Sequence, residues 1–390
     1  MSLLNRRYPL LHTYDTPTIT YIDGIMGPSS GLVGLKKFID NNDIWYCSFS
    51  TPRCFLYFNI KDLMIAEHYQ KVLAKEAYIV LDLSFEPFLD TIDSIYINVI
   101  LAHNIPPSQV IFINNMYDAD DYNRKAAVRH NSDPMRIFYF SALEWHVANH
   151  ASVVNSKPLE IKEYTKKYLN LNRRWRIHRP ILTMLLYHKK LLDKGHVSFG
   201  PCEVHTTWDE VWLLLESMTA ATPKLREAFR DSQDIKNMPW MYLDTSELHT
   251  NRAVIEASID KFYYDSYFSV ISETTFYTNE FTNSRFITEK TFKSILMRHP
   301  FVIVSVPNSL VVLKQLGYKT FAPWINESYD CVLNDNDRML AIADEIERLV
   351  NLKKEELEEF LRNVIPICEY NYQLLCSRTN FIYEDVKNGD

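Results

Sequence analysis

Short apolar segments typical of strands alternate with helical stretches along most of the chain. The first half contains the strand-like segments Tyr78–Leu83, Val110–Asn114 and Ile137–Phe140, and the second half contains Tyr168–Leu171, Trp240–Leu243, Phe268–Ser272 and Phe301–Val304. Because strands that alternate with helices pair in parallel, this pattern predicts an α/β fold with mostly parallel sheets.

The length of the chain predicts two domains. Its 390 residues exceed what one hydrophobic core usually supports. A polar stretch at 155–158 is a suitable linker, so we expect an N-terminal α/β domain in residues 1–155 and a C-terminal α/β domain in 156–390. In the second domain we expect a long helix over 178–192 and helices over 337–375, with a break at Pro366.

The overall composition is that of an ordinary folded protein, with 47% hydrophobic residues and a net charge of −7. The negative charge excludes a general attraction to nucleic acid or to anionic lipid. Six cysteines without metal-binding spacing are expected to be reduced. No apolar run has the length of a membrane span or the form of a signal peptide, so we expect a soluble, cytoplasmic protein.

One segment departs from the acidic average. Between Lys157 and Lys194 there are eleven Lys or Arg against three acidic residues, a local balance of +8. This clustering favours an anionic partner, although a solvated helix face is the alternative interpretation.

Glycines are concentrated near the N-terminus. Four of the eight in the chain, Gly24, Gly27, Gly31 and Gly34, fall within eleven residues. They follow a strand-like segment at 18–22 and precede a helical one at 32–39, for which Ser29 or Ser30 is a suitable N-cap. Such a turn allows close approach of a ligand, so Asp23, Gly24, Gly27, Ser29 and Ser30 are candidate binding residues. A structural tight turn is the alternative.

The most informative segment runs from Phe268 to Val304 as strand, loop, helix start and strand. Thr288 can cap the helix, which places Glu289 and Lys290 in its first turn. A nucleoside diphosphate needs an acceptor for ribose hydroxyls, which Glu289 supplies, and cations for its phosphates, which Lys290 and Arg285 supply. Helix capping with dipole compensation alone would explain the same residues.

This segment, with Phe286-Ile-Thr-Glu-Lys290-Thr-Phe-Lys and His299-Pro-Phe, resembles the donor-binding half of the α-1,3-fucosyltransferases. It resembles more closely a group of glycosyltransferase-like proteins encoded by phages, giant viruses and bacteria, with good coverage over residues 168–345. The resemblance implies a GT-B architecture of two Rossmann-like domains with the ligand cleft between them, and a nucleotide-sugar donor whose pocket Ser272 and Glu273 line. It also implies no cofactor and no metal, and a host-cytoplasmic location if the chain is phage-encoded.

The same resemblance assigns a phosphate contact to Arg179, the arginine that opens a helix after a strand. From the residues themselves, Pro180 fits a first helical turn, and a guanidinium at this place can hold a phosphate with two hydrogen bonds. Arg176 is the nearest rival, and Arg173 and Arg174 complete the cluster.

For the general base, Glu86 is the leading candidate because it follows a predicted strand end and precedes a proline. It matches loosely the base of the fucosyltransferases, while a paired surface glutamate is the alternative interpretation. Asp82 and Asp23 are the other candidates. With Glu86 as base, displacement at the anomeric carbon would be direct and inverting.

Metal binding is not expected. Asp118-Ala-Asp120 and Asp335-Asn-Asp337 have the Asp-x-Asp pattern of a metal site, but each is interpreted as a polar loop or helix start. His146 and His150 share helical spacing but have no third ligand.

These patterns together predict a glycosyltransferase that moves a sugar from a nucleotide-sugar to a hydroxyl. The acceptor alternatives are a hydroxymethylated base in phage DNA, and a saccharide or protein glycan. The acidic N-terminal part, with 12 basic and 16 acidic residues in 1–150, argues against DNA. A non-catalytic nucleotide- or nucleic-acid-binding protein of the same fold is the rival from another class.

Overall fold

The computed structural model describes two α/β units. The described residues are 43–48, 60–63, 66–83, 90–152, 154, 156–172, 176–199, 208–237, 241, 243, 260–278 and 285–378. The first unit comprises Met1–His146, Asn279–Phe286 and Ser377–Asp390, and the second comprises Val147–Thr278 and Ile287–Cys376.

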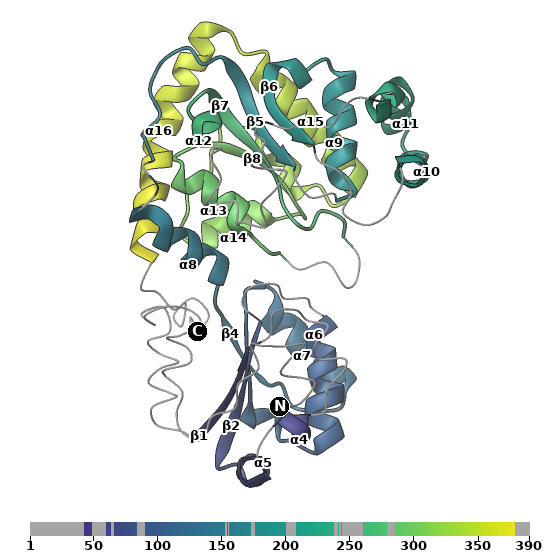
Figure 1. The fold of residues 1–390 in the computed structure, drawn as a ribbon, viewed down its shortest axis with the longest axis vertical. Coiled ribbons are helices and arrows are strands. Elements are labelled where there is room, and N and C mark those ends of the chain that lie inside the picture. Colours follow the sequence, from purple (N-terminus) through teal and green to yellow (C-terminus); the bar gives the residue numbers. More distant parts are fainter. Residues whose placement is uncertain are drawn as a thin grey trace. The chain divides into compact units, whose positions relative to one another are not determined.

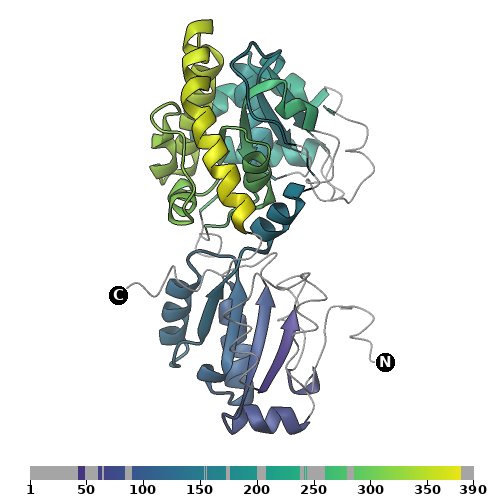
Figure 2. The same cartoon turned by 90° about the vertical axis from the view of Figure 1, so that its left-hand side faces the viewer.

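The first unit is built on a parallel sheet with the strand order β1-β2-β3-β4 (Figure 2). The strands are β1 (Asp43–Ser48), β2 (Ala77–Leu83), β3 (Val110–Asn114) and β4 (Arg136–Tyr139). The helical segments between them are α4 (Ile60–Leu63), α5 (Ala66–Leu73), α6 (Asp90–Ile95), a π-helix (Tyr96–Leu101), a 3-10 turn (Pro107–Gln109) and α7 (Ala119–Arg129). Three of the strands that the sequence predicts here are confirmed, and the predicted strand at 18–22 and helix at 32–39 lie outside the described residues.

Helices pack on one face of this sheet. Alternate strand residues, among them Leu81 and Phe112, share a core with helix residues such as Ile95 and Ala126. Each strand is added on the same side of the preceding one, and right-handed crossovers in a single direction place their helices on a single face (Figure 1). The residues of the opposite face, such as Val80 and Ile113, are buried as well. Burial of both faces explains the near-continuous apolar runs.

A closed hydrogen-bond network ties α7 to the π-helix of the first unit. Tyr96 donates its hydroxyl to Asn123 Oδ1 at 2.8 Å, and Asn123 Nδ2 donates to the Met135 carbonyl at 2.8 Å. The Met135 N–H returns to the Tyr96 hydroxyl at 3.1 Å. Both ends of the buried Asn123 amide are therefore satisfied.

The second unit has a parallel sheet in the order β6-β5-β7-β8. Its strands are β5 (Lys166–Asn172), β6 (Gly195–Phe199), β7 (Ser266–Ser272) and β8 (Phe301–Val304). The connection from β5 to β6 runs one way across the sheet and that from β7 to β8 runs the other way. Right-handed crossovers then place the helix α9 (His178–His188) and the helix α13 (Glu289–Leu296) on opposite faces, as Figure 1 shows.

The other helical segments are α8 (Ala142–Asn149), α10 (Trp208–Thr219), α11 (Pro223–Asp231), α12 (Asp260–Tyr263), α14 (Ser309–Gln315), α15 (Asp335–Val350) and α16 (Lys354–Ser377), with 3-10 turns at His150–Ser152, Leu192–Lys194, Gln233–Asn237 and Glu327–Cys331. The helix α8 contains the boundary between the units, and the others belong to the second unit except for the last residue of α16. In the part of the chain that the structure describes, none of the helices combines the length and apolar character needed to cross a bilayer.

The predicted break at Pro366 is wrong, because α16 continues through this residue. The chain breaks instead at 351–353, between α15 and α16. Proline inside a helix costs about 3 kcal/mol. Val364 and Cys368 on either side are buried, as are Phe360 and Leu361, and each apolar side chain gains roughly 1.5–3 kcal/mol on burial. Burial thus outweighs the lost hydrogen bond.

Two strands, β1 and β6, were not predicted, and one helix is shorter than predicted. The strand β6 begins at Gly195, where a Cβ atom would clash with the ring of Tyr168. The helix α9 ends at His188 rather than at residue 192. Of the predicted strand at 240–243, Met241 and Leu243 are described, and Met241 forms an antiparallel bridge to Phe199.

Candidate functional site

The strand order of the second sheet reverses between β5 and β7, its two central strands: β6 is added on one side of β5, and β8 on the opposite side of β7. In parallel α/β sheets the loops diverge at such a point, and ligands bind outside the carboxyl ends of the strands there. Asn172 ends β5 and Ser272 ends β7. These strand ends and the starts of α9 and α13 form the candidate site.

The start of α13 has the predicted cap. Thr288 is extended, with φ −106° and ψ 178°, and its hydroxyl accepts from the Lys290 N–H at 3.4 Å. The prediction that Thr288 caps the helix is therefore confirmed. Glu289 and Lys290 occupy the first turn, where N–H groups without partners inside the helix favour negative charge.

A buried carboxyl group fastens this helix start to β7. Glu273, the residue after β7, accepts from the Thr288 N–H at 3.1 Å and from the Thr291 hydroxyl at 2.6 Å. The Thr288 hydroxyl donates to its other oxygen. Glu273 is fully buried, so its role is structural: it attaches the start of α13 to the end of β7.

Lys290 and Glu289 form a partly exposed pair. Lys290 Nζ lies 2.9 Å from Glu289 Oε1 and donates to the Thr288 hydroxyl at 3.1 Å and to Thr274 at 3.4 Å. Burial acts to raise the pKa of Glu289, but the Lys290 ammonium outweighs it and holds this pKa below its ordinary value. The carboxylate can thus accept hydroxyl groups at neutral pH, and the ammonium can bind phosphate.

Arg179 lies at the start of α9 and is buried, as is its neighbour His178. The Arg179 guanidinium donates to the Ser272 carbonyl at 3.1 Å, and His178 Nε2 donates to the Glu273 carbonyl at 3.0 Å. Burial and the adjacent Arg179 push the pKa of His178 well below its usual value, so the imidazole is neutral. The prediction placed Arg179 correctly at a helix start that contains Pro180.

Polar atoms without partners lie between these helix starts. Asn172 Oδ1 and Ser272 Oγ are buried and have no hydrogen-bond partner among the described residues. The Asn172 amide donates its other end to Asn170 Oδ1. Sequence reasoning singled out Ser272 but missed Asn172, although an asparagine at the end of a buried strand is unusual and was the available signal.

A buried arginine supports the loop that follows β7. Arg338 donates to the Phe276 carbonyl at 2.6 Å, to the Ser305 carbonyl at 3.0 Å and to Asp335 at 2.6 Å. Asp335 also accepts from the Thr278 N–H at 3.1 Å. The loops after β7 and β8 are therefore fixed by side chains of α15, which sequence reasoning did not identify.

Arg285 belongs to the first unit, whereas Glu289 and Lys290 belong to the second. Its guanidinium holds the carboxylate of Asp118, with Nε 2.9 Å from Oδ2, and its backbone N–H donates to the same carboxylate at 3.2 Å. The structure thus does not group Arg285 with the residues at the start of α13. Phosphate binding by Arg285 stays a prediction, and it would require exchange of the Asp118 carboxylate for a phosphate.

Several predicted site residues lie outside the described part of the chain. They are the candidate base Glu86 and the acceptor candidates Asp23, Gly24, Gly27, Ser29 and Ser30, together with Arg173 and Arg174. Arg176 is described and exposed. Asp82, the alternative base, is buried near the end of β2.

The basic segment between Lys157 and Lys194 does not form one patch. Lys166 and Lys167 begin β5, whereas Arg176 and Arg179 follow its carboxyl end. Seven residues of strand separate these positions by about 20 Å. Several lysines of the segment pair locally: Lys162 with Glu160, Lys194 with Asp193, and Lys189 with Asp344 and Glu347. Among the described basic residues of this segment, Arg176 and Arg179 belong to the candidate site.

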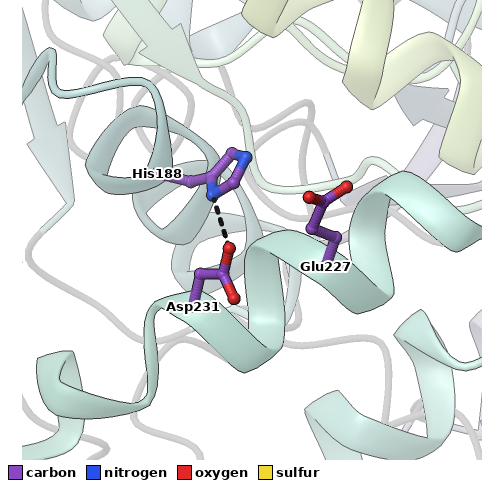
Figure 3. A group of neighbouring side chains, drawn as sticks. All are labelled: His188, Glu227 and Asp231. Atoms are coloured by element: carbon purple, nitrogen blue, oxygen red, sulfur yellow. Dashed lines mark ion pairs between the residues drawn. The ribbon is translucent and has the colours of Figure 1, made fainter.

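One group of side chains has the chemistry of a metal site. His188, Glu227 and Asp231 place three ligand atoms within 4.8 Å of one another, and Figure 3 shows the imidazole facing the Asp231 carboxylate. His188 ends α9, about 14 Å of helix from Arg179, so this group lies away from the candidate site. Asp231 is also paired with Arg230 at 3.0 Å.

The two Asp-x-Asp patterns are engaged in other ways. Asp118 pairs with Arg285 and Asp120 with Arg124, while Asp335 pairs with Arg338. His146 and His150 are not part of the one metal-like group found among the described residues.

Comparison with known proteins adds no assignment. Neither family models nor curated proteins nor solved structures gave a match to this chain.

Proposed function

We propose that this chain is a glycosyltransferase of the GT-B type that transfers a sugar from a nucleotide-sugar to a hydroxyl acceptor. The supporting observation is that Arg179 begins the helix after β5, and Glu289 and Lys290 begin the helix after β7, at the point where the strand order reverses. Nucleotides bind at such points in parallel α/β sheets. The resemblance of the 268–304 segment to the fucosyltransferases supports the same assignment.

In the proposed site, the Lys290 ammonium and the N–H groups at the start of α13 bind the diphosphate. The Glu289 carboxylate accepts ribose hydroxyls, and Ser272 Oγ, which is otherwise unsatisfied, binds a polar atom of the donor. Arg179 contributes positive potential from its buried position, Arg176 and Thr288 complete the donor side, and the buried Glu273 holds the start of α13 in place. These cations stabilise the charge that develops on the leaving diphosphate, so no metal is required.

The proposed reaction is a direct, inverting displacement. Glu86 takes the proton of the acceptor hydroxyl, whose oxygen forms the new bond to the anomeric carbon as the nucleoside diphosphate leaves. General-base catalysis is typically worth 10²–10⁴ in rate. Replacement Glu86→Gln should therefore lower the transfer rate at least about 100-fold, and a loss below about tenfold would exclude this role.

The donor site is tested by thermal shift with UDP, GDP, ADP and their sugars. At ligand near 100 times its Kd, the native state gains about 2.7 kcal/mol, a shift of several degrees for a domain of this size. The shift should be lost in Glu289→Ala/Lys290→Ala. A matched control is Lys354→Ala/Glu355→Ala, an exposed Lys–Glu pair in the first turn of α16, which should keep the shift.

The outcomes separate the alternatives. A nucleotide-selective shift that the site variant loses and the control retains supports the donor site. No shift with any nucleotide contradicts the proposed function. A shift without transfer or hydrolysis of any nucleotide-sugar would identify a non-catalytic nucleotide-binding protein of the same fold.

A further inference from the structure

The loop after β3 in the first unit contains buried amides that lack partners. Asn115 is buried, and neither Oδ1 nor Nδ2 of its side chain has a hydrogen-bond partner among the described residues. Asn114 Nδ2 is also buried and has no hydrogen-bond partner among the described residues. Three polar atoms on two successive residues are therefore unsatisfied.

Such a group opposes folding, because burial removes its water without supplying a replacement bond. Native proteins retain buried polar atoms of this kind mainly where a water, an ion or a ligand completes them. Elsewhere in the same unit the amide of Asn123 is satisfied at both ends, as described above. Other unpaired buried atoms in the described part of this unit, such as Thr91 Oγ1 and Gln109 Oε1, occur singly, whereas Asn114 and Asn115 bring three together.

That place is the carboxyl end of β3, which has β2 on one side and β4 on the other. Ligands of parallel α/β sheets bind at this edge. Two hydrogen bonds hold Asn114: the Met116 N–H donates to its side-chain Oδ1 at 2.9 Å, and the Phe140 N–H donates to its backbone carbonyl at 2.7 Å. Asn114 is therefore held in position through its backbone and its side-chain oxygen, and Asn115 is the next residue in the chain.

The surroundings favour a neutral ligand. Arg285, the cation that the structure brings to this loop, is engaged with Asp118. An amide that offers one donor and one acceptor complements two neighbouring hydroxyl groups. The rings of Tyr117 and Tyr139 lie edge to face with centroids 6.3 Å apart at the same end of the sheet, and supply apolar surface. Tyr117 and Asp118 are partly exposed, so solvent reaches the loop beside the amides.

We propose that Asn115, with Asn114 Nδ2, binds vicinal hydroxyl groups of a neutral saccharide. The interpretation of this saccharide as the acceptor rests on the proposed function. The existence of the saccharide site does not depend on it. Asn115 accepts from one hydroxyl through Oδ1 and donates to the next through Nδ2. The net negative charge of residues 1–150, with 12 basic and 16 acidic side chains, disfavours a nucleic acid in the same place.

The test compares two substitutions of buried asparagines. Asn115→Leu removes an unsatisfied amide at similar volume, and the matched control Asn123→Leu removes a satisfied one in the same unit. Binding of a panel of neutral hexoses, N-acetylhexosamines and their disaccharides is measured by saturation-transfer NMR on the full chain, with thermal midpoints recorded for each variant. A short DNA duplex serves as competitor.

We expect Asn115→Leu to weaken saccharide binding about tenfold or more, the loss of two neutral hydrogen bonds, and to leave the thermal midpoint unchanged or raised. Asn123→Leu should lower the midpoint. The proposal is overturned if the wild type binds no saccharide of the panel, if Asn115→Leu binds as the wild type does, if its midpoint falls as that of Asn123→Leu does, or if DNA displaces the saccharide.

The nucleotide thermal shift keeps this proposal separate from the proposed function. Asn115 lies in the first unit, so the shift should be the same in Asn115→Leu as in the wild type. Saccharide binding lost in Asn115→Leu, in a protein that no nucleotide shifts, would support the saccharide site and contradict the glycosyltransferase assignment. A nucleotide-dependent thermal shift in a protein that binds no saccharide would support the donor site and contradict the saccharide site.

Discussion

The buried carboxyl group of Glu273 should be one of the most sensitive positions in the second unit. It follows β7 and accepts three hydrogen bonds, from the Thr288 N–H, the Thr288 hydroxyl and the Thr291 hydroxyl. Replacement Glu273→Ala removes the acceptor and leaves these donors buried without partners. The start of α13 then loses its attachment to the sheet.

The magnitude follows from those bonds. A buried donor left unsatisfied costs about 1–3 kcal/mol. Because the three donors are adjacent and can relax together, we expect a total of about 3–5 kcal/mol, the range of severe core substitutions. The second unit has about 220 residues, and for that size 1 kcal/mol corresponds to about 2–4 °C, so its Tm should fall by roughly 10 °C.

Urea unfolding of wild type, Glu273→Ala and Thr291→Val, together with the double variant, measures the effect. Thr291→Val alone should cost about 1 kcal/mol. In the Glu273→Ala background it should cost nothing or stabilise, since it then removes a hydroxyl that has lost its acceptor. The exposed Glu355→Ala is the matched control, with a change within about 0.5 kcal/mol. A loss below about 1 kcal/mol for Glu273→Ala would refute the anchoring role.

Three further predictions concern other parts of the second unit. Burial lowers the pKa of His299 to about 4, although the Ser266 carbonyl, at 2.8 Å from Nε2, opposes this shift; because the unfolded histidine titrates near 6.5, the stability it contributes is present above pH 6.5 and is lost as the pH falls toward 4. Urea unfolding should show about 2 kcal/mol less stability at pH 5 than at pH 7 from this residue, and His299→Gln should remove that difference. Pro366→Ala restores an N–H inside α16 and should stabilise by up to about 3 kcal/mol, as read from the unfolding midpoint; a destabilised variant would contradict the helical account. Nucleotide-dependent thermal shifts should persist in EDTA and in His188→Ala, and their loss in both would indicate that the His188 group holds a required metal.

The sequence was most informative where local chemistry decides the structure. The strands β2, β3, β7 and β8 are dense in β-branched and aromatic residues and were found within one or two residues of their ends. Thr288 was identified as a cap because the capping bond is made within three residues of chain. Local preference and tertiary structure agree at these positions.

The errors lie where long-range packing overrides local preference. Pro366 was expected to end a helix, but the core residues on both sides of it keep α16 continuous. The strand β6 begins with Gly195 because any larger residue would clash with the ring of Tyr168, which lies 27 residues earlier in the chain. Arg285 stands four residues before Glu289, yet it belongs to the first unit and pairs there with Asp118, a partner that local spacing does not reveal.

The buried asparagines fall into two groups that differ in how their amides are bonded. Six asparagines are buried in the described part of the chain: Asn114, Asn115, Asn123, Asn170, Asn172 and Asn371. Asn123, Asn170 and Asn371 have both ends of the amide bonded. The other three retain unpaired atoms, and each of them ends a parallel strand or directly follows one.

An amide kept for stability should be satisfied, as Asn123 is, because an unpaired one costs free energy. The unpaired asparagine amides occur at the carboxyl ends of β3 and β5, the edge at which parallel α/β sheets bind ligands, whereas a further unpaired amide oxygen, Gln109 Oε1, lies just before β3. A polar ligand on each unit would complete them, which is the requirement of an enzyme that binds a donor on one unit and an acceptor on the other.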